Sequence, residues 1–282
     1  MIVLESERMR AEVDPAFGGR VCALWDKRAG REWLVTGPRE GDAGDAAPYG
    51  SAQARGWDEC FPTVGPCAHD AWGRLRDHGL LWGRPWRVAA HGATLRATCR
   101  GEGWSFSRTL DLHGATLAVL YEVECEADRP WMWSQHCLLA ARPGERIVLE
   151  GFEDFTAGGE VLGWPVSERE ARARDLSVVG APEEGWALKA YARARGGPVR
   201  AEVRGEEGGI ALEWDGASLP ALGLWLDWGG WPADPALGPP VHQLALEPAT
   251  APADDLAGAE GLGAARRGPA SWRTTLTLTD PS

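Results

Sequence analysis

The sequence predicts an all-β protein whose strands form a sandwich or a barrel. Three observations favour this class. Apolar and polar residues alternate in several segments, long helical periodicity is nearly absent, and turn signals such as Gly-Glu-Gly and His-Gly recur along the chain. Short strands that are punctuated at regular intervals by turn residues are typical of sandwiches and barrels.

The strand predictions follow in chain order. Residues 93–112, "ATLRATCRGEGWSFSRTLDL", indicate a strand, a glycine-containing turn and a second strand. Residues 198–216 repeat this hairpin pattern, and residues 271–280 predict a last strand. Residues 115–127 predict a strand with one apolar and one acidic face, the apolar face being Leu117, Val119, Tyr121, Val123 and Cys125 and the acidic face Glu122, Glu124 and Glu126.

Two segments predict long loops, at 37–56, which is rich in Gly and Ala, and at 229–241, which has four prolines. Neither has the Gly/Ser composition of a flexible linker. Long loops on a β scaffold often border a binding site. With no internal repeat, we expect one domain over residues 1–282.

Charge and composition exclude several classes of function. The net charge is −12 and the pI about 5.0, so the surface would repel nucleic acid and anionic lipid. No apolar stretch is long enough for a membrane span, and the start, "MIVLESERMRAEV", does not resemble a secretory leader. We therefore expect a cytoplasmic protein. The six cysteines lack zinc-knuckle spacing and are expected to be unpaired structural residues.

Tryptophan usage is unusually high, with 16 Trp against 5 Phe and 3 Tyr. An indole ring offers a flat apolar face and one N–H donor, which suits the C–H face of a sugar ring. A core built from tryptophan is the alternative for any single position. The clusters at 82/86, 131/133 and 225/228/231 leave both interpretations open.

Three residues are candidates for proton transfer: His78 in "RDHGLLW", His136 in "WMWSQHCLL", and Glu247 in "LALEPAT". A histidine titrates near neutral pH, and a carboxylate beside it in a cleft can act as a base. Because Pro248 follows Glu247, we expect this carboxylate at the end of a strand. Each residue taken alone is more often structural.

Several motifs, taken in their order along the chain, favour a functional interpretation of these three residues over a structural one. They are "FGGRVCALWDKRAGREWL", "GWDECFPTV", "DHGLLWGRPW", "WSQHCLLAARPGERI", "LWLDWGGWP" and "LALEPATAPADDL". Together the chain resembles the aldose 1-epimerase (galactose mutarotase-like) family over nearly its whole length, closer to a divergent branch than to the standard mutarotases. The resemblance implies a β-supersandwich of two large, mostly antiparallel sheets with a sugar site on one face.

The resemblance also implies roles for individual residues. Glu247 matches the catalytic base, His136 the acid that protonates the sugar, and His78 a histidine that holds and polarises the substrate. The standard enzymes have a substrate-binding arginine in the segment that corresponds to "GWDECFPTV", where this chain has other residues, and the family's substrate-binding aspartate has no clear match; Asp154 and Asp175 are candidates. The residues expected to bind substrate are Trp57, Asp58, Arg74, Trp82, Trp133 and Trp231.

The expected function is interconversion of the α and β anomers of an aldose or related sugar. The expected mechanism needs no cofactor and no metal. Arg74, Arg76 and Arg84 keep open a phosphorylated or acidic sugar. The expected partner is a small carbohydrate, without nucleic acid or membrane, for a monomer or homodimer. A non-catalytic carbohydrate-binding protein with the same cleft, and a purely structural sandwich with a tryptophan core, are the alternatives.

Overall fold

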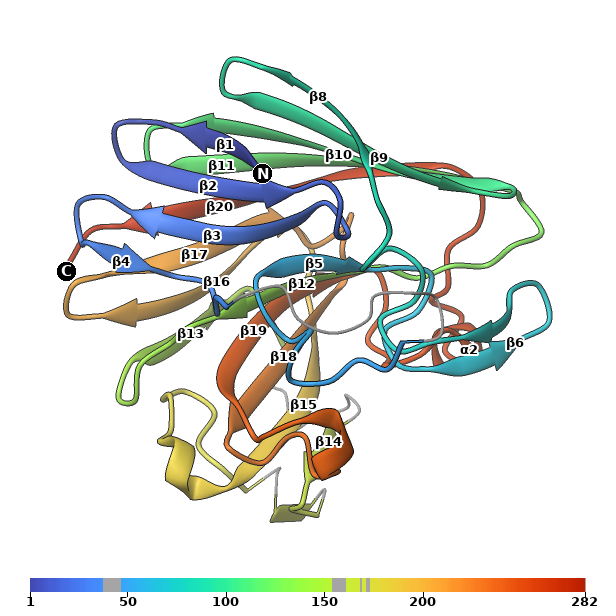
Figure 1. The fold of residues 1–282 in the computed structure, drawn as a ribbon. Coiled ribbons are helices and arrows are strands. Elements are labelled where there is room, and N and C mark those ends of the chain that lie inside the picture. Colours follow the sequence, from blue (N-terminus) through green and yellow to red (C-terminus); the bar gives the residue numbers. More distant parts are fainter. Residues whose placement is uncertain (38–46, 154–160, 168, 171–172, 282) are drawn as a thin grey trace.

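The computed structural model describes residues 1–37, 47–153, 161–167, 169–170 and 173–281. The main elements are two large antiparallel sheets (Figure 1). This arrangement confirms the predicted all-β class and the two-sheet architecture. No helix among the described residues is long and apolar enough to cross a membrane.

The first sheet contains ten strands of the described chain and holds the candidate catalytic residues. Its path is β1-β2-β3-β5-β12-β19-β18-β15-β14, with β4 paired to β3. The bounds are β1 Ile2–Glu5, β2 Met9–Asp14, β3 Arg20–Asp26, β4 Arg31–Glu32, β5 Trp57–Cys60, β12 Ser134–Leu139, β14 Val161–Trp164, β15 Trp186–Arg193, β18 Ala221–Trp228 and β19 His242–Ala249. Strands that are far apart in sequence therefore become neighbours at its centre.

The second sheet contains eight described strands in the order β13-β16-β17-β20-β11-β10-β9-β8. The bounds are β8 Arg87–His91, β9 Thr94–Gly101, β10 Trp104–His113, β11 Thr116–Cys125, β13 Arg146–Glu150, β16 Pro198–Gly205, β17 Gly208–Asp215 and β20 Ala270–Thr279. The predicted hairpins at 93–112 and 198–216 and the predicted strands at 115–127 and 271–280 are confirmed. On β11, the five residues expected on the apolar face are buried.

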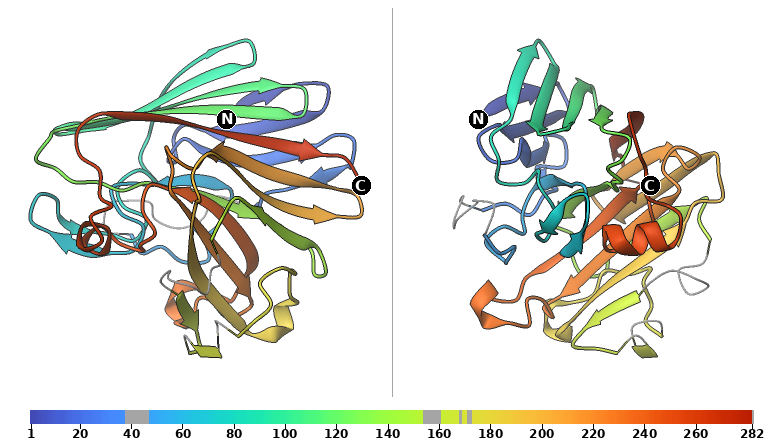
Figure 2. Two further views of the ribbon diagram at one scale, coloured as in Figure 1. Left: turned by 180° about the vertical axis from the view of Figure 1, so that it is seen from behind. Right: turned by 90° about the vertical axis from the view of Figure 1, so that its right-hand side faces the viewer.

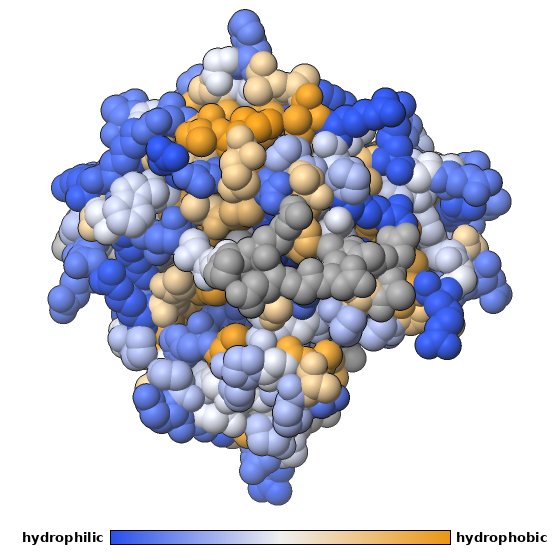
Figure 3. Space-filling model, viewed as in Figure 1, coloured by the Kyte–Doolittle hydropathy of each residue, from blue (hydrophilic) through white to orange (hydrophobic). Residues whose placement is uncertain are grey.

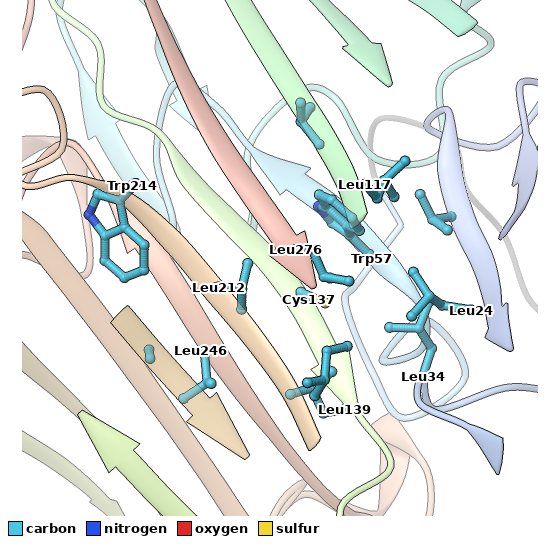
Figure 4. Close-up of a cluster of buried hydrophobic side chains, with 14 of the residues drawn as sticks. Leu24, Leu34, Trp57, Leu117, Cys137, Leu139, Leu212, Trp214, Leu246 and Leu276 are labelled. Atoms are coloured by element: carbon cyan, nitrogen blue, oxygen red, sulfur yellow. The ribbon is translucent and has the colours of Figure 1, made fainter. Parts of the chain in front are cut away.

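The two sheets pack face to face around a continuous hydrophobic cluster. Figure 4 shows Trp57, Cys137 and Leu246 of the ten-stranded sheet near Leu117, Leu212 and Leu276 of the other sheet. Successive side chains of a strand point to opposite faces of the sheet. The inward direction of these residues therefore turns their chain neighbours toward the outer face of the ten-stranded sheet.

Smaller elements lie outside the two sheets (Figure 2). They are the hairpin of β6 Cys67–His69 with β7 Gly73–Leu75, the helix α2 Leu256–Gly261, and the 3-10 turns η1 Pro182–Glu184 and η2 Pro235–Leu237. The hairpin and α2 pack into a second, small apolar cluster that also includes Cys60 of β5 and Met132. All six cysteines are unpaired, as expected. Hydrophilic side chains cover most of the periphery of the face in Figure 3.

The position of Glu247 corrects one expectation. Strand β19 continues through Pro248 to Ala249, so Glu247 lies inside a central strand and not at its end. Proline removes one N–H donor but keeps its carbonyl group. Pro248 accordingly pairs with Leu222 of β18, one residue before the last residue of β19.

Candidate functional site

The central strands of the ten-stranded sheet bring five residues into one cross-strand row. Asp58 of β5 pairs with His136 of β12, Glu247 of β19 pairs with Gly223 of β18, and Gly223 pairs with Tyr191 of β15. The register between β12 and β19, which matches 134 with 249 and 138 with 245, sets His136 opposite Glu247. Sheet register alone therefore places the proposed acid beside the proposed base.

A cavity of about 270 Å³ lies over this row. The size is at the lower end for a ligand pocket and suits a small molecule. Its lining residues are Tyr49, Ala54, Val64, Pro66, Asp77, His78, His136, Lys189, Trp225, Trp231, Gln243 and Asp254. Two larger hollows elsewhere are more open, and neither has a histidine or a lysine among its described lining residues. We therefore take this cavity as the candidate site.

His136 is held by a buried ion pair behind it. Its Nδ1 donates a hydrogen bond of 2.9 Å to Oδ1 of Asp58, while Oδ2 of Asp58 lies 2.5 Å from the Arg20 guanidinium. Burial opposes ionisation of Asp58, but Arg20 and His136 outweigh it and hold the pKa of this carboxyl below its usual range. The bond at Nδ1 leaves Nε2 as the ring nitrogen available to a ligand.

His78 reaches the same cavity from the loop after β7. Its ring stacks on Tyr49 with centroids 3.8 Å apart and lies 4.4 Å from the His136 ring. Its Nδ1 is 3.2 Å from Oδ1 of Asp77, a contact whose geometry falls short of a hydrogen bond. Burial disfavours the charged ring, but Asp77 outweighs burial and raises the pKa of His78.

The two neighbouring histidines have opposite electrostatic environments. Burial and the nearby His78 lower the pKa of His136, although its hydrogen bond to Asp58 acts in the other direction. Asp58 also forms an ion pair with Arg20, and this pairing weakens the effect of Asp58 on the pKa of His136. A site with two titratable rings of different pKa is suited to proton transfer.

Glu247 lies beneath the cavity and is fully buried. Its Oε2 accepts hydrogen bonds from Nζ of Lys189 at 2.5 Å and from Oγ of Ser134 at 3.2 Å. Its Oε1 is buried without a hydrogen-bond partner among the described residues. Burial raises the pKa of this carboxyl, but Lys189 and His136 outweigh burial and lower it, so Glu247 is ionised near neutral pH.

Several residues that surround these three were not predicted from the sequence. Tyr49 stacks on His78, Gln243 lines the cavity, and Asp254 accepts a hydrogen bond of 3.1 Å from Tyr191. A signal was present for Lys189, which is one of only two lysines in the chain and interrupts the apolar strand "WALKAYA". The others come from loops or ordinary strand positions and have no signal in a single sequence.

The expected tryptophan wall is only partly present. Trp231 lines the cavity as predicted, and Trp225 joins it. The expectation is wrong for Trp57 and Trp133, which are fully buried between the sheets and donate their indole N–H groups to Glu59. These rings satisfy a buried carboxylate, and burial raises the pKa of Glu59 to about 7.

Other expected binding residues also need correction. Asp58 does not line the cavity; it holds His136 from behind. Trp82 is fully buried, with its N–H donated to the Asp77 carbonyl and the Arg76 guanidinium 3.9 Å above its ring. Arg74 is exposed on β7 and does not line the cavity.

The anion site that the three arginines near His78 left open is not supported at this cavity. Arg76 is occupied by Trp82 and by the Gly79 carbonyl, and neither Arg74 nor Arg84 is among the lining residues. Of the two aspartates considered for sugar binding, Asp175 is exposed and bonded to Ser177, while Asp154 lies outside the described residues.

Both predicted loops border the cavity, as expected. The segment 37–56, of which 38–46 lies outside the described residues, contributes Tyr49 and Ala54. The segment 229–241 contributes Trp231. Within the described part of the chain, no group of three or more His, Cys, Asp or Glu side chains is placed to hold a metal ion.

Comparisons with solved structures identify the fold. The chain is similar to the Slr1438 protein from Synechocystis sp. PCC 6803, with a TM-score of 0.68 at 16% identity over 99% of this chain and 95% of that one. It is also similar to a galactose mutarotase related enzyme from Lactobacillus acidophilus, with a TM-score of 0.65 at 12% identity over 100% and 98% of the two chains.

A galactose mutarotase-like protein from Clostridium acetobutylicum is similar too, with a TM-score of 0.65 at 12% identity over 99% of this chain and 94% of that one. No family model and no curated protein matches the sequence. The similarities to solved structures show that the chain has the galactose mutarotase-like fold, and they confirm the resemblance inferred from the motifs at the level of the fold.

Proposed function

We propose that this protein is an isomerase that interconverts the α and β anomers of an aldose or related sugar, with Glu247 as the base and His136 as the acid. The single observation that supports this most is the convergence of His78, His136 and Glu247. They come from three distant parts of the sequence, yet His78 and His136 line one cavity of sugar size and Glu247 lies beneath it, opposite His136 across the sheet. Pure sugar binding requires no such acid–base pair.

The proposed mechanism uses side chains alone. Glu247 removes the proton of the anomeric hydroxyl, and Nε2 of His136 gives a proton to the ring oxygen. The bond between C1 and the ring oxygen breaks, and the resulting aldehyde rotates about the bond between C1 and C2. Closure on the other face then runs both proton transfers in reverse.

The remaining residues assist binding in this proposal. His78 with its partner Asp77 polarises the sugar, and the Trp231 ring covers an apolar face of it. Asp254 and Gln243 have oxygen and nitrogen atoms that suit sugar hydroxyls. The names of two structurally similar proteins, which refer to galactose mutarotase, support a sugar as the ligand.

The test compares wild type with Glu247→Gln, which keeps the size of the side chain and removes the base. Freshly dissolved α-anomers of several aldoses are followed by proton NMR, with buffer alone as the reference for spontaneous mutarotation. We expect the rate to fall by about 100-fold or more. Glu124→Gln, an exposed carboxylate on β11, is the matched control and should remain fully active.

Two outcomes would contradict the proposal. If wild type is no faster than buffer for every sugar that binds, the protein is a carbohydrate-binding protein and not an isomerase. If wild type is active and Glu247→Gln is equally active, Glu247 is not the base.

A further inference from the structure

Lys189 is an unusual residue in this chain. The protein has 29 Lys and Arg residues, of which only Lys27 and Lys189 are lysines. Lys27 lies at the surface, whereas Lys189 is 5% exposed in the middle of β15, among buried apolar neighbours. A buried ammonium group is strongly disfavoured unless it is paired. Its presence in the wall of the cavity therefore requires an explanation.

The contacts of Lys189 divide the two oxygens of Glu247 into different roles. Nζ of Lys189 and Oγ of Ser134 both bind Oε2, at 2.5 Å and 3.2 Å. Oε1 is left as a buried acceptor without a partner among the described residues. One oxygen is therefore anchored, and the other has unused capacity to accept a proton.

Gly223 provides the space in which this pair forms. It lies next to Glu247 across the sheet, and a Cβ atom at this position would be 3.2 Å from Oε2 and 3.2 Å from Cε1 of Tyr191. Both distances are tighter than ordinary contacts. A side chain here would require the anchored oxygen or the Tyr191 ring to shift by a few tenths of an ångström, a displacement that glycine avoids.

We infer that Lys189 is a positioning residue that anchors Oε2 of Glu247 and thereby assigns Oε1 as the proton-accepting oxygen. This inference rests on the proposed function, because it assigns Lys189 a task in that reaction. Lys189 also keeps the carboxylate ionised in a buried place. The other titratable groups around the pair are Asp254, His136, His78, Asp77, Cys60 and Tyr191.

The choice of lysine in a chain that otherwise uses arginine follows from donor geometry. An arginine binds a carboxylate through two parallel N–H donors and would occupy both oxygens of Glu247. The ammonium of lysine is a point charge that binds one oxygen. Glu247 and Asp254 outweigh burial and raise the pKa of Lys189. The amine therefore stays protonated and does not add to the sugar aldehyde.

The first experiment measures the pH dependence of the catalytic rate for wild type, Lys189→Met and Lys189→Arg. At low pH the rate falls as Glu247 becomes protonated, and this low-pH limb of the pH–rate profile should move up by about one to three pH units in Lys189→Met. The reason is that the Glu247 carboxylate has lost the ammonium group beside it. Lys189→Arg should keep the limb in place but lower the rate at its maximum, since Oε1 is then occupied. If the limb of Lys189→Met coincides with that of wild type, the inference is wrong while the proposed function stands.

The second experiment does not depend on catalysis. A protein with ¹³C-labelled lysine gives only two side-chain Cε resonances, and Lys27→Arg assigns them. The Lys189 resonance should titrate above its ordinary value of 10.5 in wild type and at clearly lower pH in Glu247→Gln. Titration that is unchanged by Glu247→Gln would overturn the pairing, even in a protein without isomerase activity.

Discussion

Nδ1 of His136 lies 2.9 Å from Oδ1 of Asp58, and the other oxygen of Asp58 contacts the buried guanidinium of Arg20. The proposed acid is thus the outer member of a chain of three charged or titratable side chains that ends in the interior. Arg20 also donates a hydrogen bond of 2.8 Å to the Gln53 carbonyl, in the loop that contributes Tyr49 to the cavity. The chain therefore connects the orientation of the imidazole with the wall of the site.

Replacing Asp58 with Asn should damage both stability and activity. Arg20 would be left as a buried charge without its anion, a change that typically costs about 3–5 kcal/mol of unfolding free energy. His136 would also lose the charged partner that orients its ring. Urea denaturation measures the first effect, and proton NMR of anomer exchange measures the second. Asp128→Asn, at an exposed position, is the control. An Asp58→Asn variant that is as stable as this control would contradict the role of Asp58 as the anion that balances buried Arg20.

The proposed activity should be greatest on the acidic side of neutral pH. Glu247 must be ionised and His136 protonated. The pKa of Glu247 is lowered from its ordinary 4.5, and the pKa of His136 is lowered from its ordinary 6.5. The rate above buffer should therefore fall as the pH drops through the pKa of Glu247, below 4.5, and fall again as the pH rises through the pKa of His136, below 6.5. A plateau that extends to pH values above 6.5 would instead indicate His78, whose pKa is raised, as the acid.

Replacing Trp231 with Ala should weaken sugar binding more than it slows the reaction. The ring lines the cavity without being able to transfer a proton, and loss of one aromatic face should reduce affinity by roughly tenfold, or about 1.4 kcal/mol. Titration followed by intrinsic fluorescence gives the dissociation constant. Trp25, which is 40% exposed on β3, provides the matched Trp→Ala control. Equal effects of the two variants would argue against a sugar contact at Trp231.

Asp227 should make folding stability depend on pH in an unusual direction. Its Oδ1 accepts hydrogen bonds from the backbone N–H groups of Gly230 and Trp231, and burial raises its pKa to about 7 despite these bonds. The folded state therefore retains a proton that the unfolded state loses near the ordinary value of 3.8. The stability due to this group is present below 3.8 and is lost as the pH rises to about 7.

Asp227→Asn removes this titration and keeps an oxygen that can accept the same backbone bonds. The melting temperature of the variant relative to wild type should consequently increase between pH 4 and pH 7, because only wild type loses stability there. Differential scanning fluorimetry across this range tests the expectation. A difference that stays constant with pH would show that Asp227 does not titrate in this window.

The sequence by itself determined the class of fold and much of the strand pattern. The period-two alternation at 115–127 and the turn glycines at 93–112 and 198–216 predicted strands that the structure contains, because burying one face of a sheet imposes this pattern locally. The sequence also singled out His78, His136 and Glu247, through their resemblance to family motifs, and two loops that border the cavity.

Only the tertiary structure decided which side chains face the cavity. Trp57 and Trp231 look alike in sequence, yet the first turns into the core toward Glu59 while the second lines the site. The pairing of Lys189 with Glu247 depends on β18 lying between their strands and on Gly223 leaving room there. Such contacts depend on register and strand order between segments far apart in the chain, and local alternation contains no information about either.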